Sequence, residues 1–170
     1  YNYPPKFYHI DGSEIVKKIK EEVPDSLRQI ALKIVFYQIG EKINEVLVTG
    51  ESLSQKSSQT LASLKLISSQ SKALILRPLI GMDKLEITQL AQKIGTLASS
   101  EQVKELCNLA QGSVKTSPKE KDLLQIPLLK DLIEKAVKEV KVYSGFIETK
   151  NDFPPELKNP LGVDIRPNKE

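Results

Sequence analysis

The side chains best suited to hold a phosphate or a ribose are concentrated in one loop, at residues 49–60. Small hydroxyl and amide side chains dominate this loop, in the order Thr-Gly-Glu-Ser-Leu-Ser-Gln-Lys-Ser-Ser-Gln-Thr. The loop follows an apolar run and leads into an expected helix, and the free backbone amides at a helix N-terminus bind anions. Two interpretations stay open, because Ser54 or Ser57 could instead be the N-cap that satisfies those amides.

A second loop, at residues 77–84, contributes the two strongest candidate cations. Arginine is scarce, with three residues against 22 lysines, so Arg77 is a better candidate for a bidentate anion contact than any single lysine. Lys84 falls in the first turn of an expected helix, where the helix dipole disfavours a cation by ~0.3–1 kcal/mol and a bound anion would reverse this penalty. The alternative is a solvated lysine that points away from the helix.

The remaining chemistry is limited by a single cysteine and a single histidine. Cys107 has no partner for an intrachain disulfide, and with His9 alone it cannot complete a zinc site of Cys and His ligands. The glycine patterns of self-contained nucleotide sites and the Gly-x-Ser-x-Gly pattern of serine hydrolases do not occur. The low cysteine content favours a reducing, cytoplasmic setting.

The elements expected to position these loops alternate between helices and strands. Capping residues and apolar spacing predict helices at 13–22, from Asp25, from about Ser57, at 83–95, 101–111 and 127–140, and strands at 6–10, 45–48 and 73–76. The apolar run at 73–76 is typical of a parallel strand covered by helices on both faces. We therefore expect an α/β fold, with a parallel sheet, helices on both faces and further C-terminal helices.

Length and composition fit one domain of an ordinary globular protein. The chain has 170 residues, of which 39% are hydrophobic and 28% charged. No stretch free of Asp, Glu, Lys and Arg exceeds nine residues, whereas a membrane span needs about 20 mostly apolar ones. A net charge of +3 does not identify a nucleic-acid binder. Because Tyr1 rather than Met begins the chain and no signal peptide is visible, we expect a fragment or a processed chain.

The two loops and the segment after them resemble the tRNA 4-thiouridine synthetase (thiamine biosynthesis sulfurtransferase) family. The resemblance is carried by Thr-Gly-Glu-Ser-Leu at 49–53, Gln55, Ser-Ser-Gln-Thr-Leu at 57–61, Leu-Arg-Pro-Leu-Ile-Gly-Met-Asp-Lys at 76–84 and Ile-Gly-Thr at 94–96. It runs from about residue 6 to Cys107, and weakly to Val140. It implies part of an adenine-nucleotide alpha-hydrolase-like, PP-loop ATP-pyrophosphatase domain with a helical annex at 1–143, and an extended tail at 144–170.

The same resemblance implies a reaction and roles for individual residues. The family uses ATP, with Mg²⁺, to adenylate a tRNA uridine, which then receives sulfur to become 4-thiouridine, and it also supplies sulfur for the thiazole of thiamine. Lys84 would support adenylation and Cys107 would carry sulfur. Nucleotide or phosphate contacts would come from Gly50, Glu51, Gln55, Ser58, Gln59 and Arg77. For Cys107 a second interpretation stays open, because its spacing from Val103, Leu106 and Ala110 is that of a buried helix face.

The implied partners are tRNA, a cysteine desulfurase as sulfur donor, and polypeptide that completes the domain. The family's pyrophosphate loop, Ser-Gly-Gly-x-Asp-Ser, is absent from these residues, so the chain alone is not expected to cleave ATP. In the family's sheet order, 3-2-1-4-5, two strands would separate residues 6–10 from 45–48, and a missing N-terminal half or a second copy would supply them. The alternatives are a degenerate half that serves as a binding or assembly module, and a piece of another PP-loop adenylating enzyme.

Overall fold

The computed structural model describes residues 6–53, 56–101, 109–110 and 112–144. The strands are β1 (Lys6–His9), β2 (Val46–Val48), β3 (Leu74–Leu76) and β4 (Lys141–Ser144). The helices are α1 (Ser13–Glu22), α2 (Arg28–Ile43), α3 (Leu61–Ser68), α4 (Lys84–Lys93), α5 (Leu97–Glu101) and α6 (Lys130–Lys138), with 3₁₀ turns at Asp25–Leu27, Ser57–Gln59 and Glu120–Gln125. Most predicted elements are therefore present, with shifted ends.

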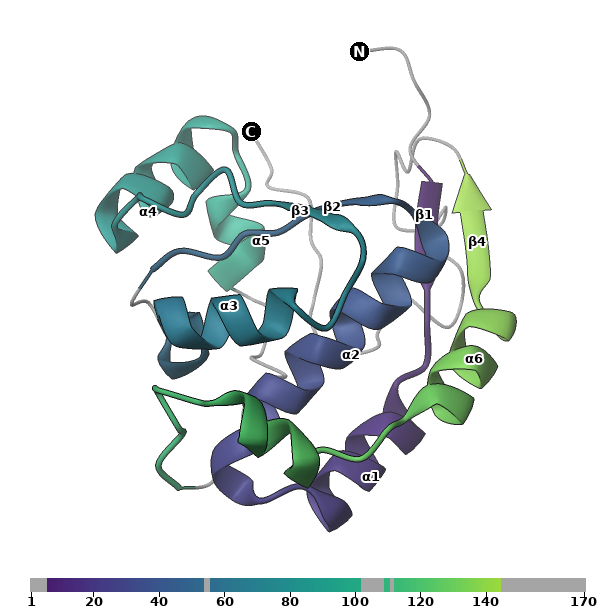
Figure 1. Cartoon of the computed structure of the whole chain (residues 1–170). Coiled ribbons are helices and arrows are strands. Elements are labelled where there is room, and N and C mark those ends of the chain that lie inside the picture. The colour runs from purple at the N-terminus through teal and green to yellow at the C-terminus, as the bar shows by residue number, and fades with distance from the viewer. Residues whose placement is uncertain (1–5, 54–55, 102–108, 111, 145–170) are drawn as a thin grey trace.

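The hydrophobic core is built around the long helix α2, against which α1 and α6 pack (Figure 1). Ile19 of α1 and Ile30 of α2 are fully buried, and Ile133 of α6 is 3% exposed. The inward face predicted for the last helix is confirmed, although α6 begins only at Lys130. Asp25 does not cap α2 as expected, because its carboxylate accepts hydrogen bonds from Arg28 and from the Gly112 amide.

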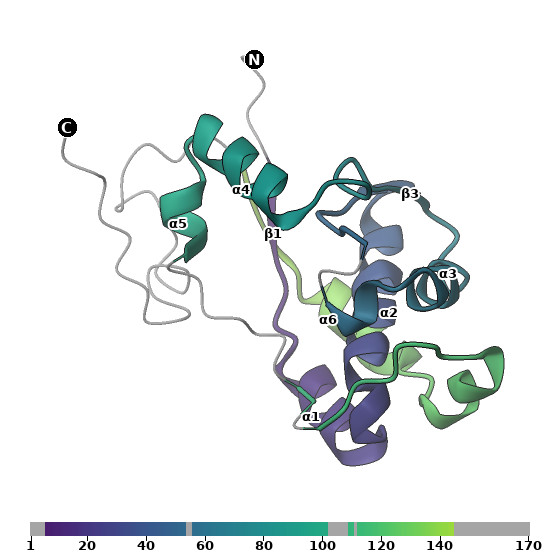
Figure 2. The same cartoon turned by 90° about the vertical axis from the view of Figure 1, so that its left-hand side faces the viewer.

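β2 and β3 pair in parallel, with Leu47 opposite Ile75. These two side chains face α2 and pack against the core, and α2 and α3 lie on the same side of the pair (Figures 1 and 2). Gly40 of α2 allows the close approach, since a Cβ there would lie 2.8 Å from a methyl of Leu47. The predicted α/β class with a parallel strand pair and C-terminal helices is thus confirmed.

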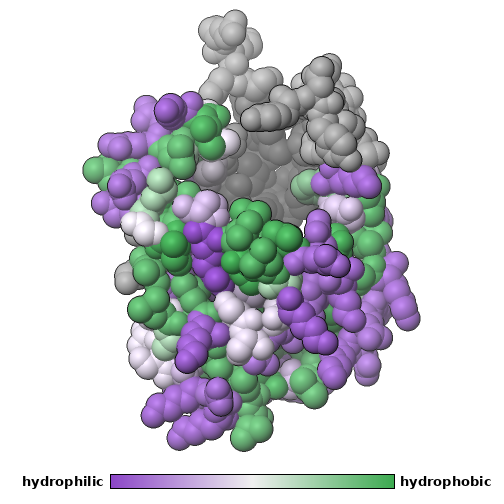
Figure 3. All heavy atoms as spheres, turned by 45° about the horizontal axis from the view of Figure 1, so that its top comes forward, coloured by the Kyte–Doolittle hydropathy of each residue, from purple (hydrophilic) through white to green (hydrophobic). Residues whose placement is uncertain are grey.

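The opposite face of the β2–β3 pair stays exposed among the described residues. The outward side chains are between 43% and 69% exposed, namely Val46, Val48, Leu74 and Leu76. Figure 3, which brings this side forward, shows apolar atoms gathered near its centre. The helix cover expected on the second face is therefore not formed over these four side chains by the part of the chain that the structure describes.

The N-terminal strand pairs with a strand that the sequence pattern did not reveal. β4 runs antiparallel to β1, with Phe7 opposite Tyr143, and joins the two ends of the described chain. Its residues follow α6 directly and their apolar side chains alternate only weakly, so sequence alone puts Lys141 and Val142 in the helical annex and Ser144 at the start of the tail. The tail at 145–170, most of the helix predicted at 101–111, and residues 1–5 lie outside the described residues.

Helix α4 differs most from expectation. Its start is as predicted: Asp83 is the N-cap and forms a capping box with Glu86. Its end is also as predicted, because Gly95 has a φ of +76°. Its apolar stripe, however, is not inward, since α4 has no buried residue and Ile94 is 63% exposed. No described helix is long and apolar enough to span a membrane.

Candidate functional site

Glu51, in the loop directly after β2, is the centre of a buried ion-pair network. One carboxylate oxygen accepts a hydrogen bond from Lys33 Nζ at 2.6 Å. The other accepts from Arg77 Nε at 2.9 Å, from Thr49 Oγ1 at 3.2 Å and from the Tyr37 hydroxyl at short range. Glu51 is only 6% exposed. A buried carboxylate needs such a complete set of donors, because an unpaired charge in the interior is costly.

The network changes the ionisation of its members. Burial works to raise the pKa of Glu51, but the hydrogen bonds from Lys33, Tyr37 and Arg77 outweigh it and hold that pKa below its ordinary value. Burial, together with the hydrogen bond to the Glu51 carboxylate, raises the pKa of Tyr37 from 10.0 to about 12. Burial opposes the charge of Arg77, yet its bond to Glu51 raises the Arg77 pKa. At neutral pH the Glu51 carboxylate is therefore ionised, the Arg77 guanidinium is charged and the Tyr37 phenol is neutral.

Arg77, at the end of β3, uses its donors inside the protein. Besides Glu51, its guanidinium donates to Ser68 Oγ at 2.7 Å and to the Tyr37 hydroxyl at 3.1 Å. Its carbon centre lies 5.9 Å from the centre of the Tyr37 ring. These contacts connect the end of β3 to Tyr37 of α2 and Ser68 of α3.

The two loops that carry the sequence signal are joined by hydrogen bonds. The Leu53 amide donates to the Ile80 carbonyl at 3.1 Å, and Ser52 Oγ donates to the Met82 carbonyl at 2.5 Å. Gln59 accepts from the Ser52 amide at 3.0 Å. Since parallel strands end at the same sheet edge, these contacts make one surface out of residues 49–53 and 77–83.

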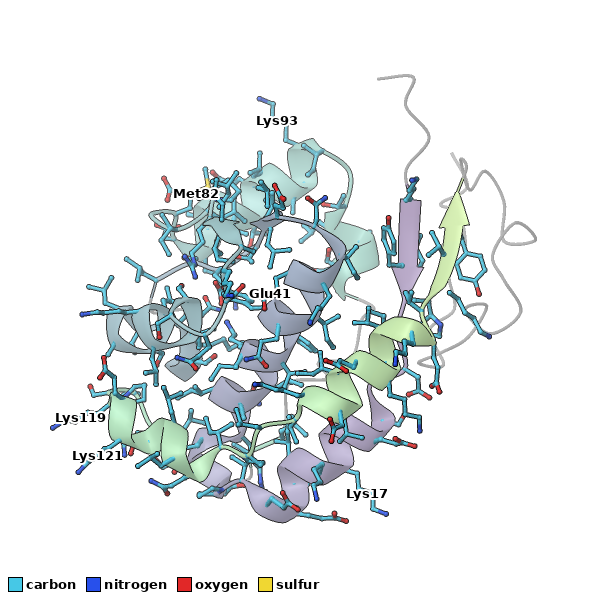
Figure 4. All side chains as sticks on the ribbon, turned by 45° about the vertical axis from the view of Figure 1, so that its right-hand side comes forward. Lys17, Glu41, Met82, Lys93, Lys119 and Lys121 are labelled. Carbon is cyan, nitrogen blue, oxygen red and sulfur yellow. The ribbon has the colours of Figure 1, made fainter. Side chains whose placement is uncertain are left out.

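Lys84 follows this surface at the start of α4. It is exposed, and it lies two residues after Met82, which Figure 4 places beside that helix. Gly50 is also exposed, and the space where a Cβ would point is open. An exposed lysine therefore follows the second of the joined loops, and an exposed glycine backbone lies on the first; groups of both kinds can bind a phosphate.

The other predicted site residues have varied positions. Ser58 is buried, in the turn at Ser57–Gln59. The N-cap of α3 is Thr60, which accepts from the Ser63 amide at 3.1 Å, so neither Ser54 nor Ser57 is that cap. Gln55 and Cys107 lie outside the described residues. The described residues contain no group of three His, Cys, Asp or Glu side chains placed to hold a metal ion.

Two functional candidates that sequence reasoning missed are Lys33 and Tyr37. They lie one turn apart on α2, in a helix whose neighbouring positions are apolar. A lysine inside such a face is itself a signal, because lysine is rarely buried unless it is paired. The partner, Glu51, is 18 positions away, and no local pattern reveals it.

The Tyr37 pKa predicts an alkaline loss of stability. The folded protein binds the phenol proton of Tyr37 more tightly than the unfolded chain does. This binding adds ~2–3 kcal/mol to the free energy of unfolding below pH 10, and the added stability is lost as the pH rises toward 12. Tyr37→Phe should lack this loss. Urea unfolding of both proteins from about pH 9 to about pH 11 tests it: the stability difference between them should shrink with pH, and a constant difference would contradict the assignment.

A known protein family matches most of this chain. A family model described as thiamine biosynthesis protein (ThiI) matches residues 2–140. The chain belongs to this family. A tRNA sulfurtransferase of Desulfurococcus amylolyticus is 37% identical over 85% of the chain and 32% of that protein. One from Escherichia coli O157:H7 is 34% identical over 95% of the chain and 37% of that protein.

A solved structure extends the likeness to the fold. The crystal structure of a 4-thiouridine synthetase–RNA complex with bound ATP matches with a TM-score of 0.75 and 30% identity, over 85% of this chain and 40% of that one. This ThiI-family chain thus spans about a third of the length of these sulfurtransferases and two fifths of the solved synthetase. The family resemblance and the PP-loop fold expected from the loop residues are confirmed.

Proposed function

We propose that this chain is the second half of the catalytic domain of a tRNA sulfurtransferase that converts a tRNA uridine to 4-thiouridine. The observation that carries the proposal is the union of its two family-specific loops, through Ser52–Met82 and Leu53–Ile80, at the carboxyl end of β2 and β3. That edge is where open α/β sheets bind ligands. The fold match to a 4-thiouridine synthetase–RNA complex with bound ATP supports the proposal.

The proposed roles of these residues follow from which side chains are exposed and which are already hydrogen-bonded inside the protein. Lys84 and the Gly50 backbone would contact the nucleotide, because both are exposed on the joined loops. Gln55 and Ser58 stay predicted contacts of the same loop. Glu51, Gln59 and Arg77 would act indirectly, since Glu51 and Arg77 bond each other and Gln59 bonds the Ser52 backbone.

The nucleotide in this proposal is ATP, which the matched synthetase structure contains. ATP supplies the adenylyl group that turns the uridine oxygen into a leaving group, and a lysine beside it would stabilise the charge that develops. Mg²⁺ belongs to the same proposal, in which it would accompany the ATP phosphates and neutralise part of their charge. Thiazole sulfur supply, a cysteine desulfurase as donor and a cytoplasmic setting belong to the same proposal.

The proposal includes polypeptide that completes the sheet. β2 and β3 form a sheet of two strands, so each has one edge that no described strand pairs. A cavity of about 830 Å³ opens beside β1, lined by Ile15 of α1 and by Val35, Phe36 and Ile39 of α2. Phe36 is 56% exposed although α2 is otherwise the core helix. Strands from the rest of the catalytic domain would cover Phe36 and pair with the free edges.

The test is thiolation by the complete protein. With ATP, tRNA, cysteine and a cysteine desulfurase, it should form 4-thiouridine, detected by nucleoside mass spectrometry. The 170 residues alone should form none. If the 170 residues assemble with the rest of the catalytic domain into a folded protein that makes no thiolated nucleoside, the alternative of a degenerate binding or assembly module is favoured.

Cys107→Ser separates the two interpretations of the cysteine in the same assay. A sulfur carrier must be a reachable thiolate, so the variant should lose thiolation while adenylation and the melting temperature persist. A core cysteine should instead lose stability and keep sulfur transfer. In the carrier interpretation a thiol from outside these residues would attack the inner sulfur of the Cys107 persulfide, which releases sulfide for the uridine and leaves a mixed disulfide that a further thiol reduces, because these 170 residues contain no second cysteine.

A further inference from the structure

We propose that Lys33 and Tyr37 of α2 are positioning residues, which set the shape of loop 49–53 for the nucleotide. This proposal rests on the proposed function, because it takes that loop as part of an ATP site. Both residues lie on one face of α2, since positions four apart in a helix are neighbours. Each donates to a different oxygen of Glu51.

The geometry directs the Glu51 carboxylate into the protein. Its two oxygens accept donors from Lys33, Tyr37, Thr49 and Arg77, and the residue is only 6% exposed. Its negative charge would also repel a phosphate. Glu51 therefore works as the fixed point that anchors its own backbone to α2.

The anchoring reaches Gly50, the exposed residue of loop 49–53, which directly precedes Glu51. Thr49, two positions before Glu51, bonds the same carboxylate, and its amide donates to the Leu76 carbonyl at 3.0 Å. Ser52, one position after, is tied to Met82. Gly50 lies between these anchors and has no side chain to restrict it, so its conformation is set by the residues that hold Glu51.

The charge of the network has a second effect on the same loop. Lys33 and Arg77 together exceed Glu51 by one positive charge, and their side chains are only 18% and 16% exposed. Such a charge is screened less than one at the surface. A cavity of about 340 Å³ adjoins it, lined in part by Lys33, Tyr37 and Thr49. The network thus both shapes the loop and leaves a net positive potential beneath it.

The test uses the complete enzyme with Lys33→Met, which keeps an unbranched side chain close to lysine's length and removes the donor and the charge. Glu51 retains Arg77, Tyr37 and Thr49 as partners, so the variant should fold. We expect kcat/KM for ATP to fall ~10- to 100-fold, because a displacement of about 1 Å in a positioning element has effects of this size. The loss should be mainly in KM and in the Kd for ATP measured by calorimetry.

Two further variants distinguish positioning from a general loss of stability. Lys33→Arg keeps a cationic donor and should restore most of the ATP affinity. Lys65→Met, an exposed lysine on α3, should match the wild type. Unchanged ATP kinetics in Lys33→Met, or an equal loss in Lys65→Met, would overturn the proposal. Wild-type enzyme without ATP-dependent thiolation would overturn the proposed function as well, whereas active wild type with an unaffected Lys33→Met overturns only the positioning role.

Discussion

Lys84→Ala in the complete enzyme should lower the rate of ATP-dependent thiolation by ~100- to 1000-fold, the usual cost of removing one group that stabilises developing charge. The melting temperature should hardly change. Lys84 is exposed, and a cation in the first turn of a helix slightly opposes the helix dipole, so its removal does not weaken α4. Single-turnover measurement of adenylation shows whether the loss lies in that step.

Lys93→Ala is the matched control for Lys84→Ala. Lys93 is an exposed lysine in the last turn of the same helix, and Figure 4 shows it pointing into solvent. The control removes one positive charge from α4 and should leave the thiolation rate within about twofold of wild type, as surface changes generally cost under ~0.5 kcal/mol. If both variants lose activity equally, the effect belongs to overall charge and Lys84 has no special role.

Ile30→Ala should lower the free energy of unfolding by about 3–4 kcal/mol. Ile30 is fully buried on α2, the helix against which α1 and α6 pack. Its truncation removes buried apolar surface and leaves a cavity. Urea unfolding followed by circular dichroism measures the difference.

The comparison variant for Ile30→Ala is Leu85→Ala. Leu85→Ala removes as many carbon atoms as Ile30→Ala does, but from a side chain that is 65% exposed on α4. Its effect should stay within ~0.5 kcal/mol. A similar loss in both variants would mean that α4 is packed against other residues, which would contradict the surface described here.

The parts of this fold that sequence predicted well are those fixed by local chemistry. The Asp83–Glu86 capping box and the left-handed Gly95 bound α4 as expected, and the parallel pair at Val46 and Leu74 follows from short apolar runs. These signals operate over three or four residues. They identified the two loops and placed them correctly at strand ends.

The parts that sequence could not predict depend on distant partners. The pairing of Phe7 with Tyr143 joins strands 136 positions apart by number, and neither strand has a strong pattern. The internal contacts of Arg77 are a second example, because nothing nearby in sequence reveals Tyr37 or Glu51 as its partners. Tertiary packing assembles the ionic networks of a core. Residue type alone therefore does not show whether an arginine pairs with residues inside the protein or contacts a bound anion.

The helix that carries Lys84 has an unusual basis for its stability. α4 has its N-terminal capping box and its glycine end, but no buried residue. Its amides should therefore exchange with solvent through local opening, at a much lower free energy than the amides of α2, which open only with the whole core. Any ligand or partner that packs on α4 supplies the burial that the helix lacks. Binding and the ordering of this helix are consequently linked equilibria, and amide exchange in α4 is a sensitive reporter of occupancy.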